Sequence, residues 1–121
     1  MRGSILVSLV VLACGCGGGS GYGGGGGTPP PPCSAATATA TTQVYIQGMA
    51  FAPSCIKVTA GAMVTFTNKD AVEHTATADG GSFDTGGLLM NQSSMKTLAT
   101  AGTFPYHCMI HTGMHGTVIV Q

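Results

Sequence analysis

The chain has 121 residues, of which four are Lys/Arg and four Asp/Glu, so the formal net charge is zero. Charged residues make up 7% of the sequence, against about 25% in a typical soluble domain. This shortage excludes a basic nucleic-acid binder and a long charged helix, and the length allows one domain at most.

The first segment, residues 1–14, is predicted to be a secretion signal peptide. Arg2 precedes an apolar run at residues 5–13, which is too short to span a membrane but has the length of a signal-peptide core. The run ends in Val11-Leu12-Ala13-Cys14, which resembles a bacterial lipobox, although Leu12 stands where a small residue is favoured. We expect lipidation at Cys14 and hence a membrane anchor. Ordinary cleavage and secretion is the alternative.

The second segment, residues 15–42, is predicted to be a flexible Gly/Pro-rich tether. It contains glycine runs at 17–19 and 23–27 and a proline run at 29–32. Glycine-rich chain behaves as a coil and consecutive prolines as a stiff, extended spacer. A coil of about 28 residues typically reaches roughly 30 Å. The tether would therefore hold a domain away from a membrane surface while leaving it free to turn.

The third segment, residues 43–121, is predicted to be a small all-β domain. Short stretches of β-branched and aromatic residues alternate with turn sequences such as Ala60-Gly61 and Gly86-Gly87, and no stretch keeps a helical apolar period over ten or more positions. Several short strands in a chain of this length indicate a β-sandwich. The candidate strands are residues 44–46, 56–58, 63–67, 74–78, 95–98, 104–108 and 117–120.

The residues with distinctive chemistry gather near the C-terminus. Cys108, His111 and Met114 have the spacing C-x-x-H-x-x-M, and His74 lies 34 residues before Cys108. Strand alternation puts Cys108 on the same face as the aromatic residues at 104 and 106, so its sulfur should lie at the edge of the core. One thiolate, two imidazoles and a weak thioether form the ligand set of blue copper. The sequence predicts one copper ion, cycling between Cu(I) and Cu(II), at these four residues.

Residues 43–121 resemble the cupredoxins of the plastocyanin, amicyanin and pseudoazurin type. The resemblance implies a Greek-key β-sandwich with His74, Cys108 and His111 as equatorial copper ligands and Met114 as the axial one. Its marks in the sequence are the four-ligand spacing, Gly102–Cys108, Asn68-Lys69-Asp70 and Gly116–Val120.

Two departures from the family pattern concern the rigidity of the site. Ile110 stands where many members have proline, and Thr75 replaces an asparagine that helps to tie the two ligand loops together. The threonine hydroxyl is a candidate replacement for that tie. We expect these differences to affect the potential and rigidity of the copper site more than the presence of copper.

The resemblance also implies that the protein shuttles single electrons between redox partner proteins. Partners are expected to dock weakly near His111, which would reach the surface inside an apolar patch that includes Met109 and Ile110. Residues 88–90, Leu-Leu-Met, either extend this patch or belong to the core. With so few charges, electrostatic steering of partners should be slight. A monomer is expected.

Other chemistries fit the sequence less well. Structural zinc sites favour paired C-x-x-C and H-x₃₋₅-H spacings, a Cys–His nucleophile lacks an orienting third residue here, and a c-type haem needs C-x-x-C-H. No catalytic residue is predicted, and the protein is not expected to be an enzyme.

The alternative function that stays open is copper storage, delivery or resistance with incidental redox cycling, which His107, His115 and the seven methionines favour. His107 should point to the outer face of its strand, and His115 is expected to be an exposed residue near the site or a competing ligand.

The five cysteines separate by role. Cys14 is predicted to carry lipid and Cys108 to bind copper. Cys33 and Cys55 are predicted to form a disulfide in an oxidising compartment, while Cys16 has no assigned partner. Together with the signal peptide, this pattern predicts a location in the periplasm or at the cell surface.

Overall fold

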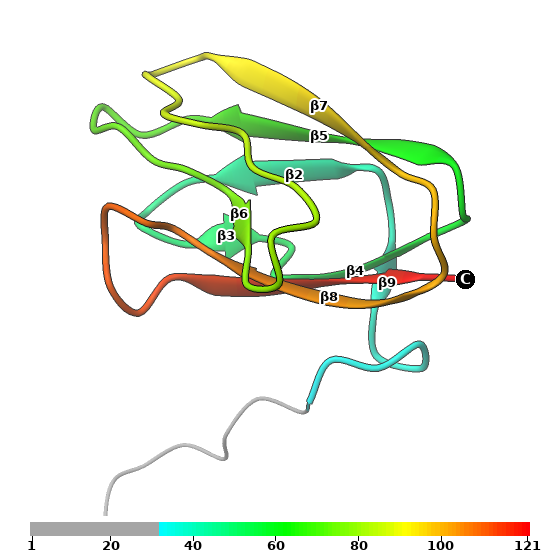
Figure 1. The fold of residues 1–121 in the computed structure, drawn as a ribbon. Coiled ribbons are helices and arrows are strands. Elements are labelled where there is room, and N and C mark those ends of the chain that lie inside the picture. Colours follow the sequence, from blue (N-terminus) through cyan, green and yellow to red (C-terminus); the bar gives the residue numbers. More distant parts are fainter. Residues whose placement is uncertain (1–31) are drawn as a thin grey trace, which may run out of the picture.

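The computed structural model describes residues 32–121, which form a sandwich of two β-sheets. Figure 1 shows the sheets stacked face to face, with β2, β5 and β7 in one layer and β4, β8 and β9 in the other. The signal peptide expected at 1–14, the lipidation site expected at Cys14 and most of the predicted tether lie outside the described residues. Among residues 32–121, no helix is long and apolar enough to cross a membrane.

The first sheet has five strands and the second has four. In sheet order, the first consists of β1 (Thr39–Ala40), β4 (Cys55–Val58), β9 (His115–Val120), β8 (Gly102–His107) and β6 (Thr77–Ala78). The second consists of β3 (Phe51–Ala52), β2 (Gln43–Ile46), β5 (Ala62–Asn68) and β7 (Ser93–Leu98). Both sheets are mixed, because β4/β9 and β2/β5 are parallel pairs while β8/β9 and β5/β7 are antiparallel.

The predicted all-β sandwich is confirmed, and the strands differ from expectation mainly at three places. Of the strand expected at 74–78, only Thr77–Ala78 forms β6, and His74 makes a single bridge to Leu88 instead. The short strands β1 and β3 were not expected from the sequence. Each has two residues, too few for an alternating pattern to be recognised.

Alternation along the strands builds the core between the sheets. Along β2, for example, Val44 and Ile46 are buried while Gln43 and Tyr45 are exposed. Three phenylalanines surround the fully buried ring of Tyr106, with ring centroids 4.7–5.8 Å away. Burial raises the pKa of Tyr106, and among the described residues its hydroxyl is the one buried side-chain polar atom without a hydrogen-bond partner. Tyr106 is therefore held by packing of its ring.

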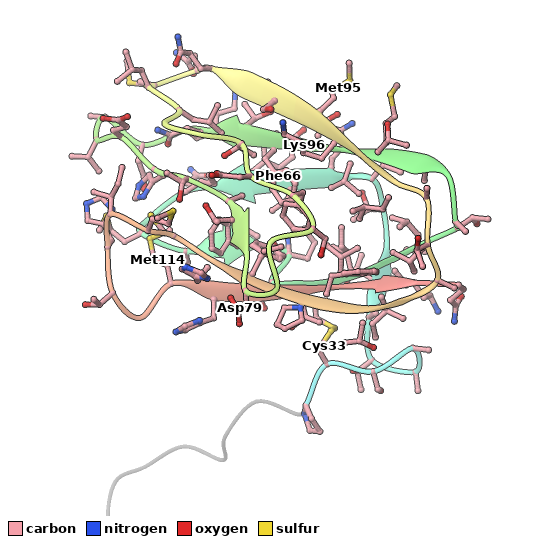
Figure 2. The ribbon with its side chains drawn as sticks, in the orientation of Figure 1. Cys33, Phe66, Asp79, Met95, Lys96 and Met114 are labelled. Carbon is pink, nitrogen blue, oxygen red and sulfur yellow. A yellow bond between two sulfur atoms is a disulfide. The ribbon has the colours of Figure 1, made fainter. Side chains whose placement is uncertain are left out.

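The folded part of the chain begins earlier than the boundary expected at Gln43. Cys33 and Cys55 are joined by a disulfide with Cα atoms 5.4 Å apart, β1 pairs in parallel with β4, and Lys57 Nζ donates a hydrogen bond to the Ala35 carbonyl. Figure 2 shows Cys33 where the described chain begins, outside the sheet that contains β4. The disulfide is the one expected from the sequence, whereas the β1/β4 pairing and the Lys57 contact are long-range and were not expected from the composition of residues 33–42.

Gly116 occupies a position where the core leaves no room for a side chain. It is the Cα partner of Tyr106 across the β8/β9 pair, and a Cβ atom at Gly116 would lie 2.3 Å from Cζ of the Tyr106 ring. We expect Gly116→Ala to lower the free energy of unfolding by about 1–3 kcal/mol, as overpacking of a dense core does. The measurement is denaturant unfolding of the metal-free protein.

Gly80→Ala is the matched control, because a Cβ at Gly80 would meet no atom within 4 Å. Its effect should stay within about 0.5 kcal/mol. Equal destabilisation by the two substitutions would contradict close packing of Tyr106 against Gly116.

Candidate metal centre

Two loops meet at one end of the sandwich and bring the predicted ligands together. The first follows β5 and carries His74, and the second joins β8 to β9 and carries Cys108 and His111. Figures 1 and 2 show the β8–β9 loop at the left end of the sandwich, where Met114 is labelled. The ligands therefore come from loops held at fixed positions by the strands behind them.

His74, Cys108 and His111 converge on one point. The Cys108 Sγ atom lies 3.8 Å from His74 Nδ1 and 3.7 Å from His111 Nδ1, and the two Nδ1 atoms are 3.1 Å apart. His74 and Cys108 are buried and His111 is partly exposed. These donor atoms lie within 4.8 Å of one another and form a possible metal site.

These spacings fit a three-coordinate metal ion. Zinc binds imidazole nitrogen at about 2.0–2.1 Å and thiolate sulfur at about 2.3 Å, so three such ligands about 120° apart separate sulfur from nitrogen by roughly 3.8 Å. The observed sulfur–nitrogen distances, 3.8 and 3.7 Å, agree with this arrangement, while the 3.1 Å between the two nitrogens corresponds to a narrower nitrogen–metal–nitrogen angle of about 100°. One thiolate and two imidazoles are also donors that suit copper. The group therefore fits a copper site.

Met114 lies at the other end of the loop that begins at Cys108. Its side chain is buried, its carbonyl accepts a hydrogen bond of 3.2 Å from the Cys108 N–H, and both residues line one cavity. This hydrogen bond closes the loop and keeps the two sulfur-bearing residues together. The role of Met114 as the axial ligand stays a prediction.

Thr75 ties the two ligand loops together. Its Oγ1 atom accepts a hydrogen bond of 2.9 Å from the Met109 N–H, and its own N–H points at the Cys108 sulfur, 3.5 Å away. The threonine hydroxyl thus makes a link between the loops, at the position where the family pattern has asparagine. The departure noted in the sequence does not leave the loops unconnected.

The surroundings of the Cys108 sulfur favour its thiolate form. Burial by itself would raise the pKa of the thiol. Hydrogen bonds from the Thr75 N–H, the His74 imidazole and the backbone and side chain of His111 outweigh burial and lower the pKa of Cys108 from 9.0 to about 6. Because thiolate is the form that binds a metal ion, the folded protein prepares this ligand before an ion arrives.

Asp70 fixes the orientation of the His74 ring. Its Oδ2 atom lies 3.0 Å from His74 Nε2, and its carboxylate accepts hydrogen bonds from the N–H groups of Gly48 and Met49 at 2.8 and 2.9 Å. The Met49 and Gly48 hydrogen bonds are the main cause of the lowered pKa of Asp70. When a metal ion binds, donation of the Nε2 proton to Asp70 leaves the lone pair of His74 Nδ1 free to coordinate the ion.

Asn68 supports the same loop from inside the core. This fully buried side chain donates hydrogen bonds from Nδ2 to the carbonyls of Leu88 and Val72 at 2.7 and 2.8 Å, and its Oδ1 accepts one from the Asp70 N–H. Asn68-Lys69-Asp70 is part of the family pattern in the sequence, but that pattern assigned no role to Asn68 or Asp70. The signal that could have found them is their position six and four residues before His74.

The surface beside His111 is apolar. Met109 is 66% and Ile110 49% exposed. Residues 88–90 were expected either to extend this patch or to belong to the core, and they do both: Leu88 is buried in the core, while Leu89 and Met90 are exposed.

His107 lies on the side of β8 away from the Cys108 sulfur, as alternation predicts, and hydrogen-bonds to Asp79. His115 is exposed.

Together, a two-sheet β-sandwich and a cysteine–histidine–histidine centre at one end define a metal-binding protein of a recognisable class. The sequence model of the cupredoxin-like domain matches residues 28–120. The chain belongs to this family.

The chain is similar to relatives of known sequence and of known structure. Amicyanin-alpha of Methylorubrum extorquens is 32% identical over 85 residues, which cover 66% of this chain and 71% of the relative. A variant of amicyanin in its Cu(I) form superposes with a TM-score of 0.63 and 28% identity, over 75% of this chain and 91% of its own. A purple cupredoxin from Nitrosopumilus maritimus shares the fold, with a TM-score of 0.59 and 22% identity. The superposition covers 65% of this chain and 98% of the purple cupredoxin.

Replacing Asp70 should weaken metal binding through His74. The two carboxylate oxygens of Asp70 accept hydrogen bonds from the Gly48 N–H, the Met49 N–H and His74 Nε2. In Asp70→Asn, an amide NH₂ group, which cannot accept, replaces one of these oxygens. The His74 ring therefore loses its fixed orientation. We expect copper affinity to fall about 10–100-fold, as for other residues that orient a ligating histidine. Competition with a chelator measures the affinity.

The matched control is Asp84→Asn, which removes the same charge from a residue whose hydrogen bonds run to Thr77 and Gly86. Its copper affinity should equal that of the parent protein. An affinity within twofold of the parent for Asp70→Asn would show that Asp70 does not orient His74.

Ionisation of Cys108 should make the metal-free protein more stable as pH rises. The folded-state pKa of about 6 lies below the ordinary 9.0, so the thiolate's contribution to stability is complete above about pH 9 and is lost as pH falls through 6. The ultraviolet absorbance of the thiolate measures the titration, and the difference from Cys108→Ala isolates this cysteine from Cys14 and Cys16. A midpoint near 9 in the folded protein would contradict the stabilisation of the thiolate.

Proposed function

We propose that this protein is a type 1 (blue) copper electron-transfer protein that carries single electrons between redox partners outside the cytoplasm. The observation that carries the proposal is the convergence of His74, Cys108 and His111, whose donor atoms lie within 4.8 Å of one another in a cupredoxin-like domain. Amicyanin, with which the chain shares 28% identity, has been solved in a Cu(I) form. Copper supplies the one-electron step.

The chain's own contribution is a set of ligands that need not rearrange. In the proposed site, His74, Cys108 and His111 would hold the copper ion, and Met114 would supply a fourth, weaker ligand. Thr75 holds the Cys108 loop, and Asp70 holds the His74 ring. A geometry fixed in this way lowers the reorganisation that accompanies gain or loss of an electron.

The proposed route for the electron is through His111. Its ring is partly exposed, whereas His74 is fully buried, so His111 is the imidazole ligand that a partner can approach. The neighbouring Met109 and Ile110 are exposed and apolar, which suits a small, short-lived docking contact with a redox protein. No nucleic-acid or substrate-binding role is proposed.

The proposed location is the periplasm or the cell surface. The Cys33–Cys55 disulfide supports an oxidising compartment. The amino-terminal signal peptide, the lipid anchor at Cys14 and the flexible linker that follows are proposed from the sequence. Together they would hold a monomeric domain near a membrane with the β8–β9 loop free to meet partners.

Copper storage or delivery is the second candidate function, and one feature favours it. His107 and His115 lie directly before Cys108 and directly after Met114, which puts additional imidazoles beside the site. A storage or delivery protein would bind more than one copper ion or release copper readily to a partner.

The absorption spectrum of the Cu(II) form separates these functions. We expect an intense visible band from thiolate-to-copper charge transfer, which a reductant bleaches and Cys108→Ala abolishes. Cys16→Ala is the matched control, since it removes a thiol outside residues 32–121 and should leave the band unchanged. Met114→Ala should keep the band and change the reduction potential, because the weak axial ligand tunes that potential. A colourless protein that binds several Cu(I) ions would refute the carrier and favour storage.

A further inference from the structure

Two histidines that take no part in the proposed copper site face each other across the β8–β9 pair. His107 ends β8 and His115 begins β9, and the two are Cα partners in the antiparallel register. Directly opposed residues of an antiparallel pair project from the same face with Cβ atoms about 4.5–5.5 Å apart. Two imidazoles at that separation can bind one metal ion between them.

Both histidines line one cavity. This cavity of about 410 Å³ is formed by the loop that carries the proposed copper ligands. It therefore has room for an ion together with water molecules. Its lining residues are His107, Cys108, Met109, Thr112, Gly113, Met114 and His115.

Asp79 prepares His107 to act as a ligand. The carboxylate of Asp79 hydrogen-bonds to His107 Nδ1, and the Asp79 N–H is anchored to the Pro105 carbonyl at 2.9 Å. Figure 2 shows Asp79 beside β8, at the lower edge of the sandwich. A histidine that donates its Nδ1 proton to a carboxylate presents an unprotonated Nε2, which is the usual arrangement of a metal-binding histidine.

The remaining ring nitrogens are available. Among residues 32–121, the structure records no hydrogen bond for His107 Nε2 or for the His115 ring. Both side chains are at least partly open to solvent, so an ion can reach them without disturbing the core.

We propose that His107 and His115 form a second metal site, specific for divalent transition-metal ions that favour imidazole, such as Zn²⁺ and Cu²⁺. Asp79 is its positioning residue. The site has two nitrogen ligands from the protein and no thiolate, so its remaining coordination positions are filled by water and the ion exchanges readily. The proposal does not depend on electron transfer at the centre formed by His74, Cys108 and His111.

Titration of the full chain with Zn²⁺ tests the site. The protein is first loaded with Cu(I), so that Zn²⁺ does not enter the other centre, and Zn²⁺ binding is then followed by calorimetry and by NMR of the histidine ring protons. We expect one Zn²⁺ per chain and shifts confined to His107 and His115. His107→Gln and His115→Gln should each lower the affinity at least tenfold.

Asp79→Asn should weaken Zn²⁺ binding about 10–100-fold while leaving the copper centre unchanged. Asp84→Asn is the matched control, because it removes the same charge from a residue whose hydrogen bonds run to Thr77 and Gly86, and its Zn²⁺ affinity should equal that of the parent.

Two outcomes would overturn the second site: no Zn²⁺ bound by the Cu(I)-loaded chain, or full binding retained in both histidine variants. Failure of the proposed electron-transfer function looks different. If Cu(I) does not fill the first centre, the parent chain takes up two Zn²⁺ ions and the His107→Gln chain takes up one.

Discussion

The Cys108 sulfur is the constraint on which the rest of the site depends. It lies in the core at the end of a strand, where an uncompensated negative charge would be costly. The Thr75 N–H and the His74 and His111 imidazoles surround it at 3.5–3.8 Å. The same groups that make thiolate tolerable inside the protein also place two nitrogen ligands at metal-binding distance, so stability and metal binding arise from one set of contacts.

Both sheets contribute to holding these groups. Cys108 follows β8 in the first sheet, whereas Asp70, which orients His74, is bound by backbone N–H groups of Gly48 and Met49 between β2 and β3 in the second. Thr75 bridges from one ligand loop to the other. A metal ion at this end would therefore connect loops that are already hydrogen-bonded, and the ligand geometry belongs to the sandwich as a whole.

The few charged side chains of the domain include two carboxylates that are paired with histidine rings. The domain from residue 43 onward holds three lysines and four acids, and two of the acids, Asp70 and Asp79, are bound to histidine rings. Charged side chains thus orient imidazoles at this end of the molecule, while the surface beside His111 stays apolar. The two carboxylate–histidine pairs are what distinguish the buried centre and the proposed surface site from histidines that merely face solvent.

Strand alternation and the C-x-x-H-x-x-M spacing are local patterns, so the amino-acid sequence alone was enough to predict the all-β class and the candidate ligands. It gave no role to Asp70 or Asn68, and it left the contribution of Thr75 open. Asp70 lies only four residues before His74, but it is held by Gly48 and Met49, which are 22 and 21 positions away. Asn68 reaches the Leu88 carbonyl 20 positions away, and Thr75 meets Met109 across 34 positions. The tertiary structure also decided that residues 33–42 join the sandwich and that His107 faces His115, since strand register fixes which distant side chains meet.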